Sequence, residues 1–327
     1  MLSYHQSFPR IEYPTEVLVE TYPGRQFYLN SSHSDGHSEN VYNLGVYSLS
    51  KHPENDNYLI PTDPLCLMAL LVVMKNDKIL KFPSVENDIT KLSASLSSNK
   101  TIDEFSSISI LSYSASSDNQ LPIIIEDSKD KKIHHIKRNI YHSNLLNSLN
   151  SSKLSLYDQT IFNYINDILF DYYTISLLSL DDSILEKYYS TSDYTLPASI
   201  KSIKPVTSMI NTQLKLYLLQ RNDFNVRNES SFQYFTSFLS SKKTKIAADE
   251  EMKTIKNKAL KTLLDLNESF SKSKYWNDNE NPTLLDTQIA AFTFSFTYMS
   301  QYIPEYNNIL EFKNLTNHSK NIICPYL

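Results

Sequence analysis

An uninterrupted apolar run constrains this chain more than any other stretch. The ten residues Leu65–Met74 are all apolar, and they follow Asp63 and Pro64. Asp is favoured at a helix N-cap, and Pro fits the first helical position because an N–H there would have no intrahelical partner. A membrane-spanning helix needs about 20 mostly apolar residues, so this run is too short to cross a bilayer. We therefore predict a helix that begins at Pro64 and is buried on all sides in a folded core.

Two other apolar stretches are also expected not to cross a membrane. The stretch 289–299, IAAFTFSFTYM, follows Asp286 and precedes Pro304, and Asp171 interrupts ILFDYYTISLLSL. The first residues, MLSYHQSFPRIEYP, resemble neither a signal peptide nor an Arg-rich transit peptide, so we expect exposure to the cytosol.

Composition excludes several functional classes. A length of 327 residues predicts two domains, and 41% hydrophobic with 20% charged residues predicts that they fold. The formal net charge of −5 gives no overall attraction for a phosphate backbone, so nucleic acid is not an expected partner. Cys66 and Cys324 share no metal or redox spacing and fit a reducing compartment.

The first half of the chain has the pattern of an α/β domain. Residues 1–40 contain Pro and Gly among polar residues and predict an irregular arm. The predicted elements that follow are a strand in VYNLGVYSL from residue 41, a loop at 50–61, the helix from Pro64, a strand at Ser107–Tyr113, a hairpin formed by Leu121–Glu126 and IHHI, and a helix at Asn139–Leu149. Strands that alternate with helices in this way are typical of an α/β layer.

The second half is predicted to be mainly helical. Apolar residues recur at helical spacing over Leu154–Leu180, about 206–220 and 244–271. Thr283 with Asp286 forms a capping-box pattern, in which each side chain accepts a hydrogen bond from the other residue's backbone N–H. The following QIAAFTFSFTYM is therefore predicted to be a helix despite its β-favouring Phe and Thr.

Few residues carry a recognisable chemistry. The three glycines lie too far apart to form a phosphate-binding loop or a nucleophile elbow. One group of residues could bind a metal, since imidazole and carboxylate ligands suit zinc: His33, Asp35, His37 and His52. The alternative interpretation is a polar loop without a metal. The adjacent His134 and His135 would point to opposite sides of a strand.

A lysine-rich stretch at Ser241–Lys261 admits two interpretations. Seven lysines stand there against Asp249, Glu250 and Glu251. They could face anionic lipid head groups or an acidic partner, or they could simply form the solvated face of a helix.

The order of elements resembles the glutathione-transferase architecture, in which a thioredoxin-like half precedes an all-helical half. Leu121-Pro122 stands where that family has its cis-proline turn, so Pro122 is a candidate cis-proline. Thr283 to Asp286 stands where the helical half has its buried cap. The resemblance implies an α+β to mainly α fold with an arm at 1–40, a thioredoxin-like domain at 41–152 and an all-helical domain at 153–327.

The chain departs from these enzymes where their activity resides. KKIHHIKRN stands where they hold the γ-glutamyl group of glutathione, and Cys66 falls inside the apolar helix. The start of that helix offers only Thr62, Asp63 and Pro64. We therefore predict no catalytic, cofactor-binding or metal-binding residue and no enzymatic activity.

A closer resemblance is to the fungal metaxin-like receptor subunits of the mitochondrial sorting and assembly machinery. It rests on YNLGVYSL, TDPLCLMALLVV, LPIIIEDSKDKKI and LYDQTIFNYINDILFDYYTISLLS, and it is best from about Tyr42 to Leu180. It implies a peripheral subunit on the cytosolic face of the outer membrane. Its implied partners are a membrane-embedded barrel subunit, a second metaxin-like subunit and β-barrel precursors, whose C-terminal β-signal it would help to recognise.

Two alternatives remain open from the sequence. A glutathione-dependent transferase or reductase would need a thiol-binding pocket near Pro122 and a nucleophile after the first strand. The other metaxin-like subunit of the same machinery usually carries a hydrophobic C-terminal anchor, whereas this chain ends in NLTNHSKNIICPYL.

Overall fold

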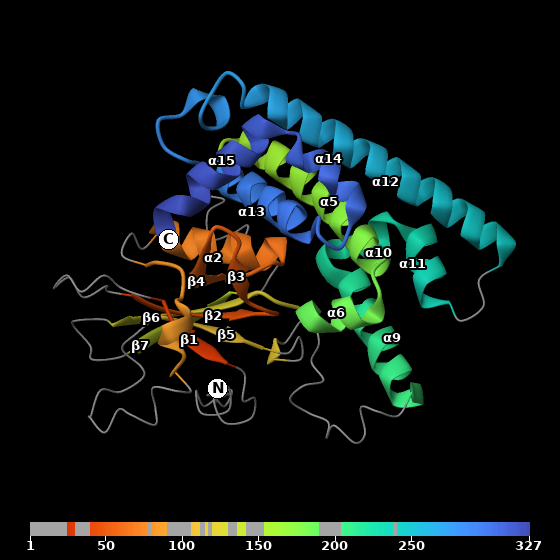
Figure 1. The fold of residues 1–327 in the computed structure, drawn as a ribbon, viewed down its shortest axis with the longest axis horizontal. Coiled ribbons are helices and arrows are strands. Elements are labelled where there is room, and N and C mark those ends of the chain that lie inside the picture. Colours follow the sequence, from red (N-terminus) through yellow and green to blue (C-terminus); the bar gives the residue numbers. More distant parts are fainter. Residues whose placement is uncertain are drawn as a thin grey trace, which may run out of the picture.

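The chain has an α+β fold in which helices cover one side of a mixed β-sheet (Figure 1). This architecture comes from a computed structural model. The structure describes residues 25–29, 40–76, 80–89, 106–111, 115–116, 120–129, 136–141, 154–189, 204–237 and 241–327.

The sheet is built around a buried central strand. Its strands are β1 (Gln26–Tyr28), β2 (Asn40–Val46), β5 (Ser107–Ile110), β6 (Ile123–Lys129) and β7 (Ile136–Tyr141), in the order β1-β5-β2-β6-β7. Strand β2 runs parallel to β5 and antiparallel to β6, and β7 runs antiparallel to β6. Leu44 of β2 lies between Ile108 and Ile124, and all three are buried. A hairpin after Leu121 is confirmed, but β6 continues through Lys129 of the expected turn, and the second strand is Ile136–Tyr141 rather than IHHI.

Helix α2 (Pro64–Asn76) lies between the sheet and the remaining helices (Figure 1). Every residue from Pro64 to Met74 is buried, so the prediction of a core helix is confirmed. It packs against β2 on one side and against α13 (Leu284–Met299) on the other. A helix that has apolar neighbours on all sides needs no polar face, which explains the unbroken apolar run.

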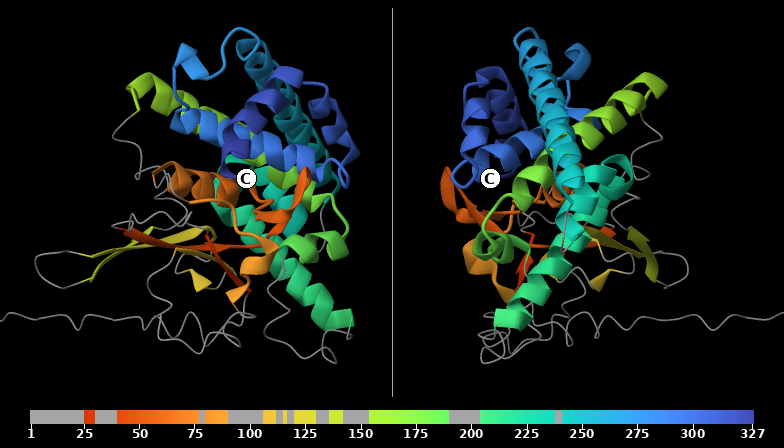
Figure 2. Two further views of the ribbon diagram at one scale, coloured as in Figure 1. Left: turned by 60° about the vertical axis from the view of Figure 1, so that its left-hand side comes forward. Right: turned by 90° about the vertical axis from the view of Figure 1, so that its right-hand side faces the viewer.

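The helical layer is centred on α13, which packs against α2, α5 (Leu156–Leu178) and α15 (Lys313–Ile323). The long α12 (Lys242–Ser269) lies on the side of this layer remote from the sheet (Figures 1 and 2). The other elements of the layer are α5 (Leu156–Leu178), α6 (Asp182–Tyr189), α9 (Lys204–Gln220), η6 (Arg221–Asp223), α10 (Phe224–Arg227), α11 (Glu229–Thr236), α12 (Lys242–Ser269), η7 (Trp276–Asp278), η8 (Pro304–Tyr306), α14 (Asn307–Leu310), α15 (Lys313–Ile323) and η9 (Cys324–Tyr326). The predicted long helices of the second half are confirmed.

Three expectations from the sequence were wrong in the α/β layer. Residues 50–61 were expected to form a loop, but β3 (Ser50–His52) and β4 (Asn55–Ile60) pair as a hairpin. Residues 139–141 were expected to begin a helix but end β7, where the cross-strand ion pair of Arg138 with Asp127 (2.7 Å) supports pairing. The arm at 1–40 was expected to be irregular, yet Gln26–Tyr28 forms β1 and pairs with β5.

The strand β4 shows why the hairpin was missed. It begins Asn-Asp-Asn, residues that are typical of turns, and only Leu59 and Ile60 at its end are buried. Pairing with β3 rather than alternation along the strand therefore keeps it extended. Within the described residues, no helix combines the length and the apolar character that crossing a bilayer requires.

Gly45 in β2 supplies a test of this packing. A Cβ atom there would lie 2.5 Å from Leu111 Cδ1 and 2.7 Å from Ile123 Cγ2. We expect Gly45→Ala to lower the free energy of unfolding by about 1–3 kcal/mol, because overpacking a close-packed site costs this much. Urea unfolding of the purified protein measures the effect.

Leu111→Val provides the matched control because it removes the nearer obstacle. The double variant Gly45→Ala/Leu111→Val should lose less unfolding free energy than the sum of the losses in the two single variants. Additive effects would contradict the contact.

Candidate functional site

The N-terminus of α2 meets the helical layer at a buried cluster of polar side chains. We call it the Asp63 cluster; its members are Tyr47, Asp63, Tyr173, Tyr189 and Arg221. Asp63 precedes α2, Tyr47 follows β2, Tyr173 and Tyr189 belong to α5 and α6, and Arg221 begins η6. Residues far apart in the sequence are thus brought to one point between sheet and helices.

Asp63 is the centre of the cluster. Its Oδ1 accepts a hydrogen bond from the backbone N–H of Cys66 at 3.0 Å, which caps the first turn of α2. Its Oδ2 accepts hydrogen bonds from the Tyr189 hydroxyl and from Arg221 Nη1, each at 2.8 Å. Arg221 Nη2 donates to Asp63 Oδ1 at 3.0 Å, so the ion pair is bidentate.

Arg221 also holds the loop that enters β6. Its Nη2 donates to the carbonyl of Leu121 at 3.1 Å, and the Leu121–Pro122 peptide bond is cis. The guanidinium lies 4.7 Å from the ring centre of Tyr47 and 5.3 Å from that of Phe170. One side chain therefore contacts the start of α2, the proline turn and two aromatic rings.

The cluster is closed to solvent. Arg221 and Asp63 are only 1% and 2% exposed, and Tyr173 and Tyr189 are equally buried. The Tyr173 and Tyr189 hydroxyls lie 2.6 Å apart, and the Tyr47 hydroxyl accepts a hydrogen bond from the backbone N–H of Leu121 at 3.2 Å. Among the described atoms of the cluster, Arg221 Nε has no hydrogen-bond partner.

Electrostatics keep the ion pair charged and the neighbouring groups neutral. Burial alone would raise the pKa of Asp63, but the charge and hydrogen bonds of Arg221 outweigh it and hold the pKa of Asp63 below its ordinary value. Burial raises the pKa of the Cys66 thiol and of the Tyr47, Tyr173 and Tyr189 hydroxyls. None of these four groups is an ionised nucleophile at neutral pH.

A second buried cap holds α13. Thr283 and Asp286 form the reciprocal capping box, with Thr283 N–H donating to Asp286 Oδ2 at 2.7 Å and Asp286 N–H donating to Thr283 Oγ1 at 3.2 Å. Asp286 Oδ1 also accepts a hydrogen bond from the backbone N–H of Trp276 at 2.8 Å and lies 2.9 Å from His318 Nε2. His318 of α15 is buried and stacks on Phe270.

The other candidates from the sequence are dispersed. His52 is buried in β3 and stacks on Phe294, and its Nδ1 accepts a hydrogen bond from Glu54 N–H at 3.2 Å. His33, Asp35, His37, His134 and His135 lie outside the described residues. Within the described residues, no three His, Cys, Asp or Glu side chains gather as metal ligands. Cys66 is buried, Cys324 is exposed, and both are free thiols.

Sequence reasoning placed Asp63 at the helix start but missed its partners. Arg221 stands 158 positions further along the chain and belongs to no local motif. The same holds for His318, 32 positions beyond Asp286. The apolar LYLL shortly before Arg221 was the one available signal for the first pair, because it places a cation next to a buried helix face.

A comparison with known protein families bears on identity. Residues 5–126 match the family model of SAM35, a subunit of the SAM complex. This match covers the first part of the chain and supports its identification as a SAM35 protein. A search of curated protein sequences found no match.

The SAM35 match supports a place for the chain in the SAM complex of the mitochondrial outer membrane and a role in β-barrel assembly and protein insertion. The match agrees with the resemblance to subunits of the sorting and assembly machinery that the sequence indicated. The matched segment contains Tyr47, Asp63 and the Leu121–Pro122 bond, whereas Tyr189 and Arg221 lie beyond it. The SAM35-matched part and the helical part thus each contribute one side of the Asp63 cluster.

The ion pair predicts a specific pattern of stability. Arg221→Met or Asp63→Asn alone should lower the free energy of unfolding by about 3–5 kcal/mol, because each leaves a buried group without its charged partner. The double variant Asp63→Asn/Arg221→Met should be more stable than the Arg221→Met protein. Urea unfolding in a double-mutant cycle measures the coupling, and additive losses would contradict a direct interaction.

The pKa of Asp63 predicts how this stability depends on pH. Since the folded-state pKa lies below the ordinary value of 3.8, the contribution is fully present above that value and is lost as pH falls through the folded-state pKa. Below about pH 4 the wild type should therefore lose more unfolding free energy than the Asp63→Asn/Arg221→Met variant. Urea midpoints at pH 6, 4.5 and 3.5 test this, and a pH-independent difference would contradict it.

Proposed function

We propose that this SAM complex subunit is a non-enzymatic receptor and assembly subunit that helps to recognise the β-signal of β-barrel precursors. In this proposal it lies peripherally on the cytosolic face of the outer membrane. Its partners there are the membrane-embedded barrel subunit, a second metaxin-like subunit and the precursors themselves.

The sheet topology supports a glutathione-transferase-like fold for this receptor. Strands β2 and β5 are parallel neighbours connected through α2, and β6 and β7 follow as an antiparallel hairpin next to β2. A cis bond at Leu121–Pro122 precedes β6, where the resemblance to that fold expects one. We accordingly propose a thioredoxin-like domain at 41–152 and an all-helical domain at 153–327, preceded by the arm at 1–40.

The Asp63 cluster is the observation that carries the non-enzymatic part of the proposal. A glutathione transferase needs space for a thiol beside the proline turn and the start of the first helix. Here the guanidinium of Arg221 occupies that space, bound to Asp63 and to the Leu121 carbonyl. Arg221 and Asp63 are only 1% and 2% exposed, and the neighbouring Tyr47 hydroxyl and Cys66 thiol stay protonated.

A strand-recognising subunit also needs a surface that suits a strand. The incoming β-signal carries unpaired N–H and C=O groups, which are costly to leave bare in lipid and which pair readily with the edge of a sheet. Strand β7 forms one edge of the five-stranded sheet, and among the described residues no strand pairs with its outer side. Ile140 of β7 is 40% exposed. This edge supports the receptor part of the proposal.

Purification from mitochondria tests the proposal. The tagged chain should co-purify with a β-barrel membrane protein and be released from membranes by alkaline carbonate, since no described helix could hold it in the bilayer. A cross-linkable peptide carrying a β-signal should label the chain, and a peptide of the same composition in scrambled order should not. A wholly soluble, monomeric chain in cell extracts would exclude the assembly role.

Glutathione provides the test of the alternative activity. Turnover of a generic electrophile with glutathione, or retention of the chain on immobilised glutathione, would favour a transferase or reductase over the receptor. We expect neither from the wild-type protein. Equal labelling by the two peptides would remove the β-signal part of the proposal while leaving the assembly role intact.

A further inference from the structure

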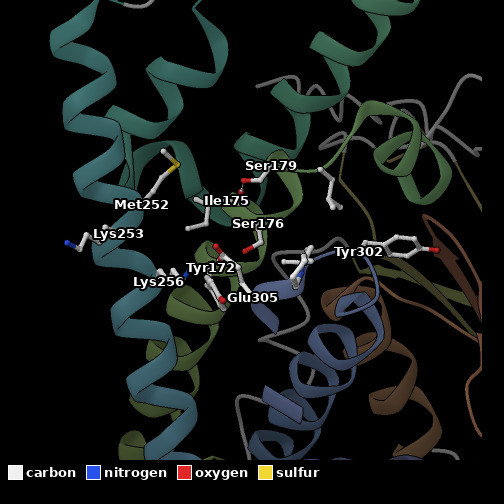
Figure 3. Close-up of a pocket in the computed structure, with 12 residues that line it drawn as sticks. Tyr172, Ile175, Ser176, Ser179, Met252, Lys253, Lys256, Tyr302 and Glu305 are labelled. Atoms are coloured by element: carbon white, nitrogen blue, oxygen red, sulfur yellow. Dashed lines mark hydrogen bonds and ion pairs between the residues drawn. The ribbon is translucent and has the colours of Figure 1, made fainter. Parts of the chain in front are cut away.

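A cavity of about 380 Å³ opens in the helical layer, away from the Asp63 cluster (Figure 3). It lies between α5, α12 and the η8 turn. Small-molecule sites are commonly concave, mostly apolar and about 300–1,000 Å³ in volume, so this cavity is at the lower end of that range. The apolar part of its wall consists of Ile175, Leu180, Met252, Ile303 and Pro304.

The cavity has a polar end. Figure 3 shows Tyr172, Lys256 and Glu305 together at one end, with Ile175 and Met252 further along the wall. Lys256 Nζ lies 2.8 Å from Glu305 Oε2, and both side chains are partly exposed, so the pair is accessible to a ligand. The wall away from this pair also carries the hydroxyl groups of Ser176, Ser179 and Tyr302 among its apolar side chains, so the cavity suits an amphiphile rather than a purely apolar ligand.

The Tyr172 hydroxyl is the strongest sign that something binds there. Tyr172 lines the cavity and is fully buried, and its hydroxyl has no hydrogen-bond partner among the described residues. A buried hydroxyl without a partner costs about 1–3 kcal/mol. Burial, with a smaller effect from Glu305, raises the pKa of Tyr172, so the hydroxyl stays protonated and can donate. A ligand that carries an acceptor would satisfy it.

Charge indicates which acceptor this is. Two lysines and one glutamate line the cavity, which leaves one excess positive charge. Lys256 is compensated by Glu305, whereas Lys253, one turn earlier on α12, has no ion pair with any described residue. Figure 3 shows its ammonium group turned away from the cavity, and its flexible four-carbon stem lets the group turn inward. An anionic acceptor is therefore favoured over a neutral one.

We propose that this cavity binds an amphiphile with a single acyl chain and an anionic head group, a carboxylate or a phosphate. The chain lies along Ile175, Leu180 and Ile303, and the head group accepts hydrogen bonds from Tyr172 and Lys256 and attracts the Lys253 ammonium. The volume suits one short chain rather than the two chains of a phospholipid. The proposal is independent of β-signal recognition, because it uses none of the α/β layer.

Fluorescence titration of the purified full-length chain with 11-(dansylamino)undecanoic acid tests the site. We expect a saturable rise in dansyl emission, and displacement of the probe by decanoate or decyl phosphate. Whichever competes more strongly identifies the head group. Decanol has the same chain without the charge and should compete at least about tenfold more weakly, given the strength of hydrogen bonds to charged groups.

Three variants locate the binding. Tyr172→Phe and Lys253→Ala should each weaken binding by about three- to tenfold. Lys258→Ala is the matched control, since Lys258 is an exposed lysine of the same helix that does not line the cavity; it should bind within about twofold of the wild type. Tyr172→Phe should retain full stability to urea, because the hydroxyl that it removes has no partner in the fold.

The outcomes separate clearly. Binding that is weakened by Tyr172→Phe and Lys253→Ala but not by Lys258→Ala supports the site. Lack of saturable binding by the wild type, or equal binding by the wild type and Tyr172→Phe proteins, would overturn it. Competition by decanol as strong as that by decanoate and decyl phosphate would overturn the anionic head group.

Discussion

The bidentate ion pair between Asp63 and Arg221 connects every layer of this molecule. Asp63 begins the helix that lies on the sheet, and Arg221 begins a short turn of the helical layer. A buried ion pair contributes little net stability relative to apolar residues of the same volume, because desolvation offsets most of the attraction. Its effect is on geometry, since any other arrangement of the two layers would leave one of these groups unpaired in an apolar core.

This geometry also limits the chemistry that the fold can perform. The start of a helix after a central strand, beside a proline turn, is a suitable place for a polar ligand because backbone N–H groups are free there. In this chain Asp63 binds the N–H of Cys66, and Arg221 lies between Asp63 and the carbonyl of Leu121. An assembly subunit gains from such a closed arrangement, because a rigid contact between layers holds its outer surfaces in fixed relative positions.

Much of the fold follows from local sequence patterns. The run Leu65–Met74 with Asp63 before it is sufficient to place a buried helix and its first residue, and Thr283 with Asp286 is sufficient to turn a β-favouring stretch into α13. The β3–β4 hairpin was missed because turn-forming residues occupy a strand that only pairing keeps extended. The partners of the two buried aspartates were not predictable, because Arg221 and His318 are brought in by tertiary structure and carry no signal at the level of spacing.

The two buried caps share a physical role that explains why the core contains charge at all. Helices α2 and α13 pack against each other, and both bury nearly all of their sides. A helix with one exposed polar face is held in one rotation by that pattern, but a helix that is buried on nearly all sides is not. In each of the two helices the aspartate at the first turn is bound by a side chain from a distant element, Arg221 for α2 and His318 for α13. These directional bonds fix the rotation that apolar packing leaves undetermined, since hydrophobic contact is non-directional whereas hydrogen bonds weaken steeply with misalignment.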